Sequence, residues 1–303
     1  MNTEKKLEKT QDLPDGFDYV GDVYRPPGEA HNILIQATIG CSHQACTFCS
    51  GHFGKQFALK DDSVLERDLS FAECYCKRQD RVFVMDGNAL VMPMSRWIWL
   101  LKHIRTRLPW VVGVGAFATA LDLSQKSDAD LKELRSLGLD RLYVGVESGH
   151  AAVLERIRKG IDPTQLLAQC ARAKEAGFVL NVSVLLGIVD AGLSLQHARA
   201  TGELLSALNP DAVTVMTLIP QPGTVMRDEI DQGELVPPDT FGILAELREL
   251  YLHTKLRGGL FDYSHSSGYF PFTARLPEER QTGLESIDLA LSGQRALKRR
   301  RRI

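Results

Sequence analysis

The sequence has no apolar run near the ~20 residues that a membrane-spanning helix needs. Its N-terminal segment, MNTEKKLEKTQDL, is charged and lacks the apolar stretch of a signal peptide. Low-complexity segments and solenoid-type repeats are also missing. These absences argue against a secreted, membrane-spanning or repeat protein, and we expect a cytoplasmic one.

The sequence also carries little net charge, and that charge is unevenly placed. Removing the five positive charges of Lys298–Arg302 from the formal net charge of −2 leaves −7 on residues 1–297. An acidic body is a poor surface for a nucleic-acid backbone, so nucleic acid is not an expected partner. We expect residues 298–303 to form a solvated basic tail, with a contact role as the alternative.

Structural disulfides are rare in a reducing compartment, so the six cysteines suggest metal binding or catalysis. Three of them, Cys41, Cys46 and Cys49, lie within nine residues directly after a predicted strand. Thiolates are soft ligands that suit iron–sulfur clusters, zinc or copper. A cubane cluster has four irons, so three thiolates leave one iron free to bind another molecule. The remaining cysteines are expected to pack within helices: Cys74, Cys76 and Cys170.

A zinc site with His43 as its fourth ligand is the alternative for this loop. Zinc sites of this kind normally draw their ligands from two separated turns, and four ligands within nine residues would be strained. The iron–sulfur cluster is therefore the preferred interpretation.

Short apolar segments alternate with helical patterns over the first two thirds of the chain. The expected strands are Ile33–Ile39, Val82–Met85, Val111–Phe117, Leu142–Val146, Phe178–Leu186 and Ala212–Leu218. The expected helices are Ser95–Arg107, Ser127–Leu137, Pro163–Ala176 and Leu195–Leu208, then Thr240–Leu256 and Pro277–Leu291. This alternation predicts an α/β fold of parallel βαβ units, whose chemistry gathers at the carboxyl ends of the strands.

The cysteine loop and the strand–helix pattern resemble the radical S-adenosylmethionine (SAM) superfamily. In that family three loop cysteines bind a 4Fe–4S cluster, and the fourth iron chelates SAM, which is then cleaved to a 5′-deoxyadenosyl radical. The resemblance implies a partial (β/α)6 TIM-type barrel, with Cys41, Cys46 and Cys49 as the metal ligands. The first cysteine gap has four residues, where three is commoner, but the second gap and the aromatic Phe48 match the family.

Two further segments carry the resemblance within residues 33–225. Asp86, Gly87 and Asn88 stand where the family has a Gly-Gly-Glu-like motif that receives the SAM amino group. The segment Arg141–Gly149, followed by Arg158-Lys159-Gly160, resembles the branch that contains coproporphyrinogen dehydrogenase and the tRNA methylthiotransferases. In that branch the residue at the position of Glu147 contacts SAM.

The fifth expected strand supplies two more candidate SAM contacts. Ser183, together with Asn181, shares one face of this strand, because alternate positions point the same way. We expect Ser183 to reach the ribose or carboxylate of SAM. Gly187 lies in a segment that resembles the family's support for the adenine, although it could equally be an ordinary strand end.

Beyond the expected barrel, Gly258–Phe272 is rich in glycine and aromatic residues. We expect it to fold over the barrel mouth, with His265 and Tyr263 as candidate catalytic groups that exchange protons with the substrate. The alternative is a surface loop in which these side chains only pack. The predicted organisation is an N-terminal extension (1–30), the barrel (31–225), a C-terminal extension of helices and loop closing the mouth (226–297) and the basic tail (298–303).

These features together predict a radical SAM enzyme that abstracts hydrogen from a small or medium-sized substrate. We expect neither a second cluster nor an added cobalamin-binding or RNA-binding domain, because few cysteines remain and the 303 residues offer little spare length. The expected partners are the substrate and an external one-electron donor of the flavodoxin or ferredoxin type. The alternatives are a zinc- or cluster-binding protein associated with RNA, and a sensor that never cleaves SAM.

Overall fold

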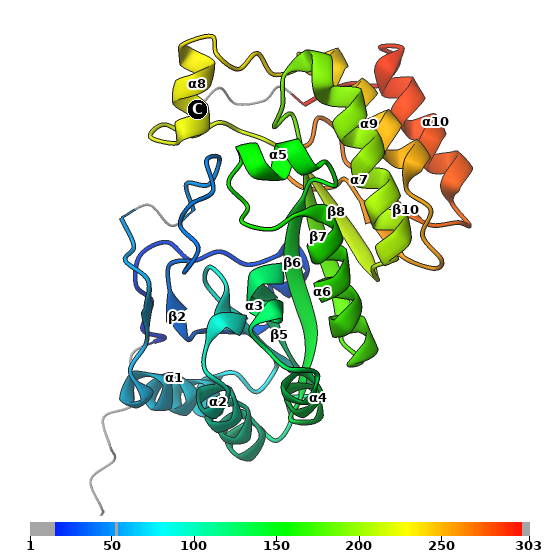
Figure 1. Cartoon of the computed structure of the whole chain (residues 1–303). Coiled ribbons are helices and arrows are strands. Elements are labelled where there is room, and N and C mark those ends of the chain that lie inside the picture. The colour runs from blue at the N-terminus through cyan, green and yellow to red at the C-terminus, as the bar shows by residue number, and fades with distance from the viewer. Residues whose placement is uncertain (1–15, 52–53, 299–303) are drawn as a thin grey trace, which may run out of the picture.

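The computed structural model describes residues 16–51 and 54–298, and its centre is one curved sheet with helices along its outer side (Figure 1). Six parallel strands follow one another across the sheet in chain order. They are β1 (Ile33–Gln36), β4 (Arg81–Met85), β5 (Gly113–Ala118), β6 (Leu139–Glu147), β7 (Val179–Leu186) and β8 (Ala212–Thr217). Consecutive parallel strands that form one curved sheet confirm the predicted partial barrel.

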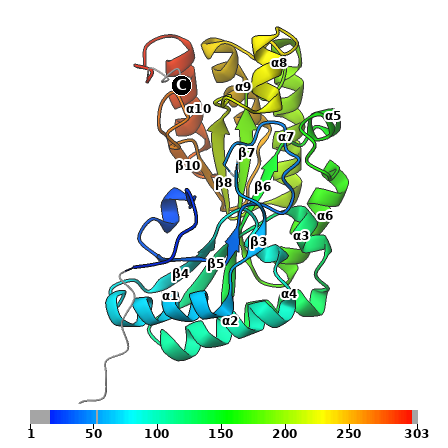
Figure 2. The same ribbon diagram turned by 90° about the vertical axis from the view of Figure 1, so that its left-hand side faces the viewer.

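Helices connect these strands and cover the outer face of the sheet (Figure 2). They are α1 (Asp62–Tyr75), α2 (Met94–Arg107), α3 (Ala120–Ser124), α4 (Asp128–Ser136), α5 (Ala151–Arg156), α6 (Pro163–Glu175) and α7 (Ser194–Leu208). Ser127 caps α4 through a reciprocal capping box with Asp130, and Pro163 opens α6 behind the cap Asp162. The predicted starts of these two helices are therefore confirmed.

The burial pattern of β6 shows which side of the sheet forms the core. Leu142, Val144 and Val146 are buried under the helices, whereas Tyr143 and Gly145 on the opposite face are only partly buried. Strands β7 and β8 alternate in the same way. The main core therefore lies between sheet and helices, and the concave inner face carries the partly exposed side chains.

The C-terminal part differs from the predicted helices and loop, because it extends the barrel wall. Strand β9 (Leu260–Asp262) pairs in parallel with β8, and β10 (Thr273–Arg275) pairs antiparallel with β9. Each strand has only three residues, too few to show an alternating pattern in the sequence. Helices α8 (Val225–Asp231), α9 (Thr240–His253) and α10 (Arg280–Leu291) complete this part, with α9 packed along α7 (Figure 1).

Residues 16–30 pack against the barrel and end in a short 3-10 helix, Pro27–Glu29. The buried carboxylate of Glu29 accepts hydrogen bonds from Asn32, from Arg141 at 3.0 Å and from the hydroxyl of Tyr143 at 2.5 Å. Because Arg141 and Tyr143 belong to the inner face of β6, this segment reaches the inside of the sheet. No described helix is long and apolar enough to cross a membrane. Residues 1–15 and most of the basic tail lie outside the described residues.

Candidate functional site

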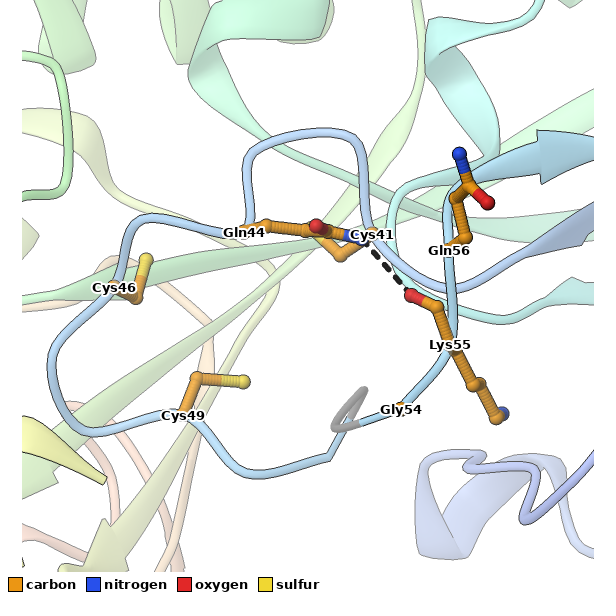
Figure 3. A pocket seen from close by; sticks show the side chains of 7 residues that line it. All are labelled: Cys41, Gln44, Cys46, Cys49, Gly54, Lys55 and Gln56. Carbon is orange, nitrogen blue, oxygen red and sulfur yellow. Dashed lines mark hydrogen bonds between the residues drawn. The ribbon is translucent and has the colours of Figure 1, made fainter. Parts of the chain in front are cut away.

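The three cysteines of the loop line one cavity at the carboxyl end of the barrel. The loop lies between β2 (Thr38–Ile39) and β3 (Ala58–Leu59), a short antiparallel pair beside the main sheet. The cavity has a volume of about 350 Å³. Its walls are Cys41, Gln44, Cys46, Cys49, Gly54, Lys55 and Gln56 (Figure 3). The structure thus places the three predicted thiols around one cavity. Nothing in the sequence indicated that Lys55 and Gln56 would form its polar wall.

The thiols are free, and burial disfavours their charged thiolate forms. Burial raises the pKa of Cys41 and of Cys49, and it raises the pKa of Cys46 to about 11. The nearby Lys159 ammonium acts in the opposite direction on all three thiols. Metal ions bind thiolates, so positive charge beside this cavity assists loading.

The arrangement fits a multi-iron cluster better than a single metal ion. Within the described residues, no three His, Cys, Asp or Glu side chains converge as ligands of one ion. In a cubane each thiolate binds a different iron, so the thiols need only surround a shared cavity. His43 turns away from the cavity, with its Nε2 2.8 Å from the carbonyl oxygen of Arg158. The geometry therefore gives no support to the zinc alternative.

Asp86 holds the start of the cysteine loop. It is fully buried at the end of β4, in the left-handed region with φ +73°. Its Oδ2 accepts hydrogen bonds from the backbone N–H of Gly40 at 3.0 Å and from Nε2 of Gln36 at 2.7 Å. The Lys55 ammonium lies 3.2 Å from the same oxygen. A carboxylate with three such donors fixes the backbone that leads into Cys41.

Asn88 holds the next residue of the loop. Its Oδ1 accepts a hydrogen bond from the backbone N–H of Ser42 at 2.9 Å, and its Nδ2 donates to Oγ of Ser42 at 2.8 Å. The same Nδ2 donates to Asp122 on α3, whose pKa is raised by burial. Asp86 and Asn88 thus contact the cysteine loop, and the SAM contacts expected for them stay predictions.

Gly87 separates these two residues and allows the loop to approach the end of β4. A Cβ at this position would lie 2.5 Å from the Cα of Cys41 and closer still to the carbonyl oxygen of Gly40. Both contacts are with backbone, which cannot rotate away as a flexible side chain can. Only glycine lets the loop take its observed place.

Gly87→Ala is therefore expected to displace the cysteine loop and reduce the iron that the reconstituted protein retains by roughly tenfold. Gly54→Ala is the matched control, because Gly54 also lines the cavity with positive φ but has no heavy atom within 4 Å of the added Cβ. Iron and sulfide analysis after gel filtration measures both variants. Equal iron in the two variants would show that the close approach at Gly87 is dispensable.

Glu147 and Lys159 form a buried ion pair beside the cavity. Lys159 Nζ lies 2.9 Å from Glu147 Oε1, and their side chains are 9% and 8% exposed. Burial alone would lower the pKa of Lys159, but Glu147 and the thiols of Cys46 and Cys41 raise it on balance. A Cβ on Gly145 would overlap the carboxylate and lie 3.0 Å from Nζ, so the absence of a side chain there makes room for the pair.

The turn that contains Lys159 also supports the cysteine loop. The carbonyl of Ile157 accepts a hydrogen bond from the N–H of Thr47 at 3.1 Å, and the carbonyl of Arg158 contacts His43. Arg158 and Gly160 both have positive φ, at +53° and +77°. The segment Arg158-Lys159-Gly160 is singled out in the sequence by its resemblance to the family. The ion pair of Lys159 with Glu147 depends on the shape of this turn, so it could not be predicted from the residues alone.

The remaining predicted SAM contacts lie on or beside the inner face. Ser183 and Asn181 occupy partly exposed positions on the inner face of β7, as their spacing predicts. Gly187 follows β7 with φ +74°. Phe48, between Cys46 and Cys49, is partly buried against the core. The SAM-binding roles of these residues stay predictions.

Tyr263 and His265, the candidate catalytic residues, follow β9. Tyr263 is fully buried, its ring packs edge-on against Phe270, and its hydroxyl lies 3.3 Å from Oγ1 of Thr217. His265 is partly buried, with Nδ1 2.8 Å from Oγ of Ser267, and burial lowers its pKa. The packing of Tyr263 matches the alternative interpretation, in which the side chains of this segment only pack, and the catalytic roles of both residues stay predictions.

Comparison with known proteins agrees with this geometry. The Radical SAM superfamily matches residues 35–200 of the chain. Heme chaperone HemW of Bacillus subtilis (strain 168) is 28% identical over 235 residues, which cover 75% of this chain and 60% of that protein. An uncharacterized methyltransferase of Pyrococcus horikoshii, PH0819, is 23% identical, and the match covers 67% of this chain and 42% of the relative. The chain therefore spans about half the length of these two relatives.

Solved structures support the same fold. Methylornithine synthase superposes with a TM-score of 0.54 at 18% identity, covering 75% of this chain and 64% of that one. Coproporphyrinogen III oxidase of Escherichia coli, described as a radical SAM enzyme, superposes with a TM-score of 0.52 at 18% identity. That superposition covers 71% of this chain and 50% of the oxidase.

Proposed function

The chain belongs to the radical SAM superfamily, and on that premise we propose that it is an enzyme that abstracts hydrogen from a small or medium-sized substrate. Members of this superfamily bind a 4Fe–4S cluster and SAM, which confirms the predicted cofactors. When bound and reduced, the cluster supplies the electron that splits SAM into methionine and a 5′-deoxyadenosyl radical. The protein's own residues bind, orient and shield these reactants.

The observation that carries this proposal is the cavity lined by Cys41, Cys46 and Cys49. Three thiolates leave one iron without a protein ligand, and that iron is the one that SAM would occupy. Asp86 and Asn88 hold the backbone on both sides of Cys41, through the N–H groups of Gly40 and Ser42.

The residues around the cavity have the charges that SAM needs. SAM carries an ammonium, a carboxylate and a sulfonium, so it is bound best by groups of both signs. Glu147 provides a negative charge at the end of β6, and Lys159 provides a positive charge beside it. Asn181 and Ser183 extend a neutral polar surface along the inner face of β7, where the ribose and the substrate would lie.

An external one-electron donor of the flavodoxin or ferredoxin type is proposed to reduce the cluster. His265 and Tyr263 are proposed to exchange protons with the substrate. Of the two, His265 is the better placed, because its side chain is only partly buried. Burial lowers its pKa, which favours the neutral imidazole that can accept a proton at neutral pH.

The proposal is tested by loading the full chain anaerobically with iron and sulfide and adding SAM to the reduced protein. We expect a brown protein that absorbs at about 400 nm, and an electron paramagnetic resonance signal that changes when SAM is added. A cluster whose signal does not change when SAM is added would contradict the proposal. A colourless protein with one tightly held zinc would favour the zinc alternative.

A second candidate, heme carriage, is raised by the relative named as a heme chaperone, because that match covers 75% of this chain. Titration of the cluster-free protein with heme distinguishes it. A stoichiometric complex with a sharp Soret band, formed by a protein that cleaves no SAM, would favour heme carriage over radical chemistry.

A further inference from the structure

A row of buried polar groups joins the C-terminal part of the protein to two strand ends at the proposed SAM site. Its centre is Glu246 on α9, which is fully buried. The carboxylate accepts hydrogen bonds from the backbone N–H of Gly187 at 3.1 Å and from the hydroxyl of Ser194 at 2.7 Å. In the described part of the chain no lysine or arginine forms an ion pair with it. Glu246 therefore acts mainly as an acceptor for backbone and hydroxyl donors.

His197 on α7 extends this row of buried polar groups toward Ser148, at the end of β6. Its Nε2 lies 3.0 Å from the carbonyl oxygen of Leu185 and 3.4 Å from Oε1 of Glu246. A carbonyl oxygen can only accept, so Nε2 carries the proton and Nδ1 accepts in the neutral ring. Nδ1 lies 2.9 Å from Oγ of Ser148, which also accepts a hydrogen bond from the N–H of His150. Burial lowers the pKa of His197 to about 4, consistent with this neutral tautomer.

Both ends of this row of buried polar groups lie at proposed SAM contacts. Ser148 directly follows Glu147, and Gly187 directly follows β7. Gly187 has φ +74°, and a Cβ there would lie 2.7 Å from the side chain of Ile243 on α9. Helix α9 thus packs on this turn and hydrogen-bonds its backbone, so the position of the turn depends on α9.

We infer that Glu246 is a positioning residue for SAM, because it holds the turn at Gly187 by accepting its N–H. His197 lies beside Glu246 and contacts the turn at Ser148. The inference rests on the proposed function, and it makes α9 a required part of the SAM site. Glu246 lies outside residues 35–200, the part of the chain that matches the superfamily. Its carboxylate contacts the backbone of Gly187, a predicted SAM contact, but Glu246 itself is not proposed to touch SAM. Its effect on SAM therefore passes through the position of that turn.

The chemistry of the site argues against a role as packing alone. Burying a carboxylate is unfavourable, and a leucine of similar volume would fill the space at a lower free-energy cost. Burial raises the pKa of Glu246 to about 7, although the bonds from Ser194 and Gly187 favour the ionised form. A leucine could not accept a hydrogen bond from the N–H of Gly187, so that N–H would be buried without a partner.

The test compares SAM binding by three cluster-loaded, oxidised variants, because oxidised protein binds SAM without cleaving it. For Glu246→Ala we expect affinity to fall at least tenfold, since the Gly187 turn loses its anchor. Glu246→Gln keeps an acceptor for Gly187 and is expected to stay within about threefold of wild type. Glu249→Ala is the control: Glu249 also joins α9 to α7, through Arg199 at 2.9 Å, but on the outer side.

Amide hydrogen exchange gives a readout that does not depend on SAM. In Glu246→Ala we expect faster exchange in a peptide spanning Gly187, with unchanged exchange in β5. Ser194→Ala removes one donor from the same carboxylate and keeps the test open if Glu246→Ala fails to fold. We expect SAM affinity about threefold weaker in that variant.

The outcomes separate this inference from the proposed function. Wild-type affinity in Glu246→Ala, or in Ser194→Ala when the former does not fold, would overturn the positioning role alone. Equal losses in Glu246→Ala and Glu249→Ala would also overturn it, because any loosening of α9 would then suffice. A wild-type protein that holds its cluster but binds no SAM would overturn both.

Discussion

Replacing Cys41, Cys46 or Cys49 with alanine is expected to remove at least about nine tenths of the cluster iron. Each thiolate would bind a different iron, so loss of any one opens the cluster to solvent and dissociation. The fold should survive, because these thiols line a cavity outside the hydrophobic core. Iron and sulfide analysis and visible absorption after anaerobic reconstitution measure the loss.

Cys74→Ala is the matched control for this prediction. Cys74 is an exposed, free cysteine on α1, and it is not part of the cavity wall. We expect this variant to retain wild-type iron. A loss of iron in Cys74→Ala, or a full cluster in any of the three loop variants, would mean that the ligands have been assigned wrongly.

Lys159→Met is expected to lower the free energy of unfolding by about 3 kcal/mol, because it leaves the Glu147 carboxylate buried without its partner. The double variant Glu147→Gln/Lys159→Met should recover most of that loss, since neither charge then remains in the interior. Urea unfolding of the cluster-free proteins gives the free energy of unfolding of the wild type, the single variant and the double variant. The double variant should nevertheless bind SAM poorly, because the charges proposed to contact SAM are gone.

An exposed ion pair provides the contrast for this prediction. Arg227 and Asp231 lie one turn apart on the surface of α8, and Arg227→Met should leave the unfolding free energy unchanged within error. A double variant no more stable than Lys159→Met would show that the two side chains do not form an isolated pair. Restored SAM binding in the double variant would instead show that the pair serves stability only.

Much of the barrel could be predicted because its strands are short, apolar and rich in β-branched residues. Phe178–Leu186 was predicted one residue longer than β7, which spans Val179–Leu186. Leu142–Val146 was predicted shorter than β6, because Asp140 and Arg141 at its start are charged. These polar positions are explained by tertiary partners, since Asp140 pairs with Arg81 and Arg141 with Glu29. A single sequence does not reveal such pairs.

The candidate site could be predicted where local spacing defines it and not where distant contacts do. The three thiols are close in sequence, and Asp86 and Asn88 are predicted because their segment resembles the Gly-Gly-Glu-like motif of the family. What these two residues bind could not be predicted, because their partners lie 46 residues away in the cysteine loop. Glu246 was missed for a similar reason: within a helical pattern it resembles an ordinary surface acid, and only the packing of α9 on Gly187 buries it.

The most direct test of radical SAM catalysis is to reduce the cluster-loaded wild-type protein with SAM present and quantify 5′-deoxyadenosine and methionine. We predict that the two products form together in equal amounts, and that neither forms above background in the Cys41→Ala, Cys46→Ala and Cys49→Ala variants. A fully loaded, reduced protein that binds SAM and releases neither product would contradict radical catalysis. It would leave a cluster-binding protein that uses SAM for sensing.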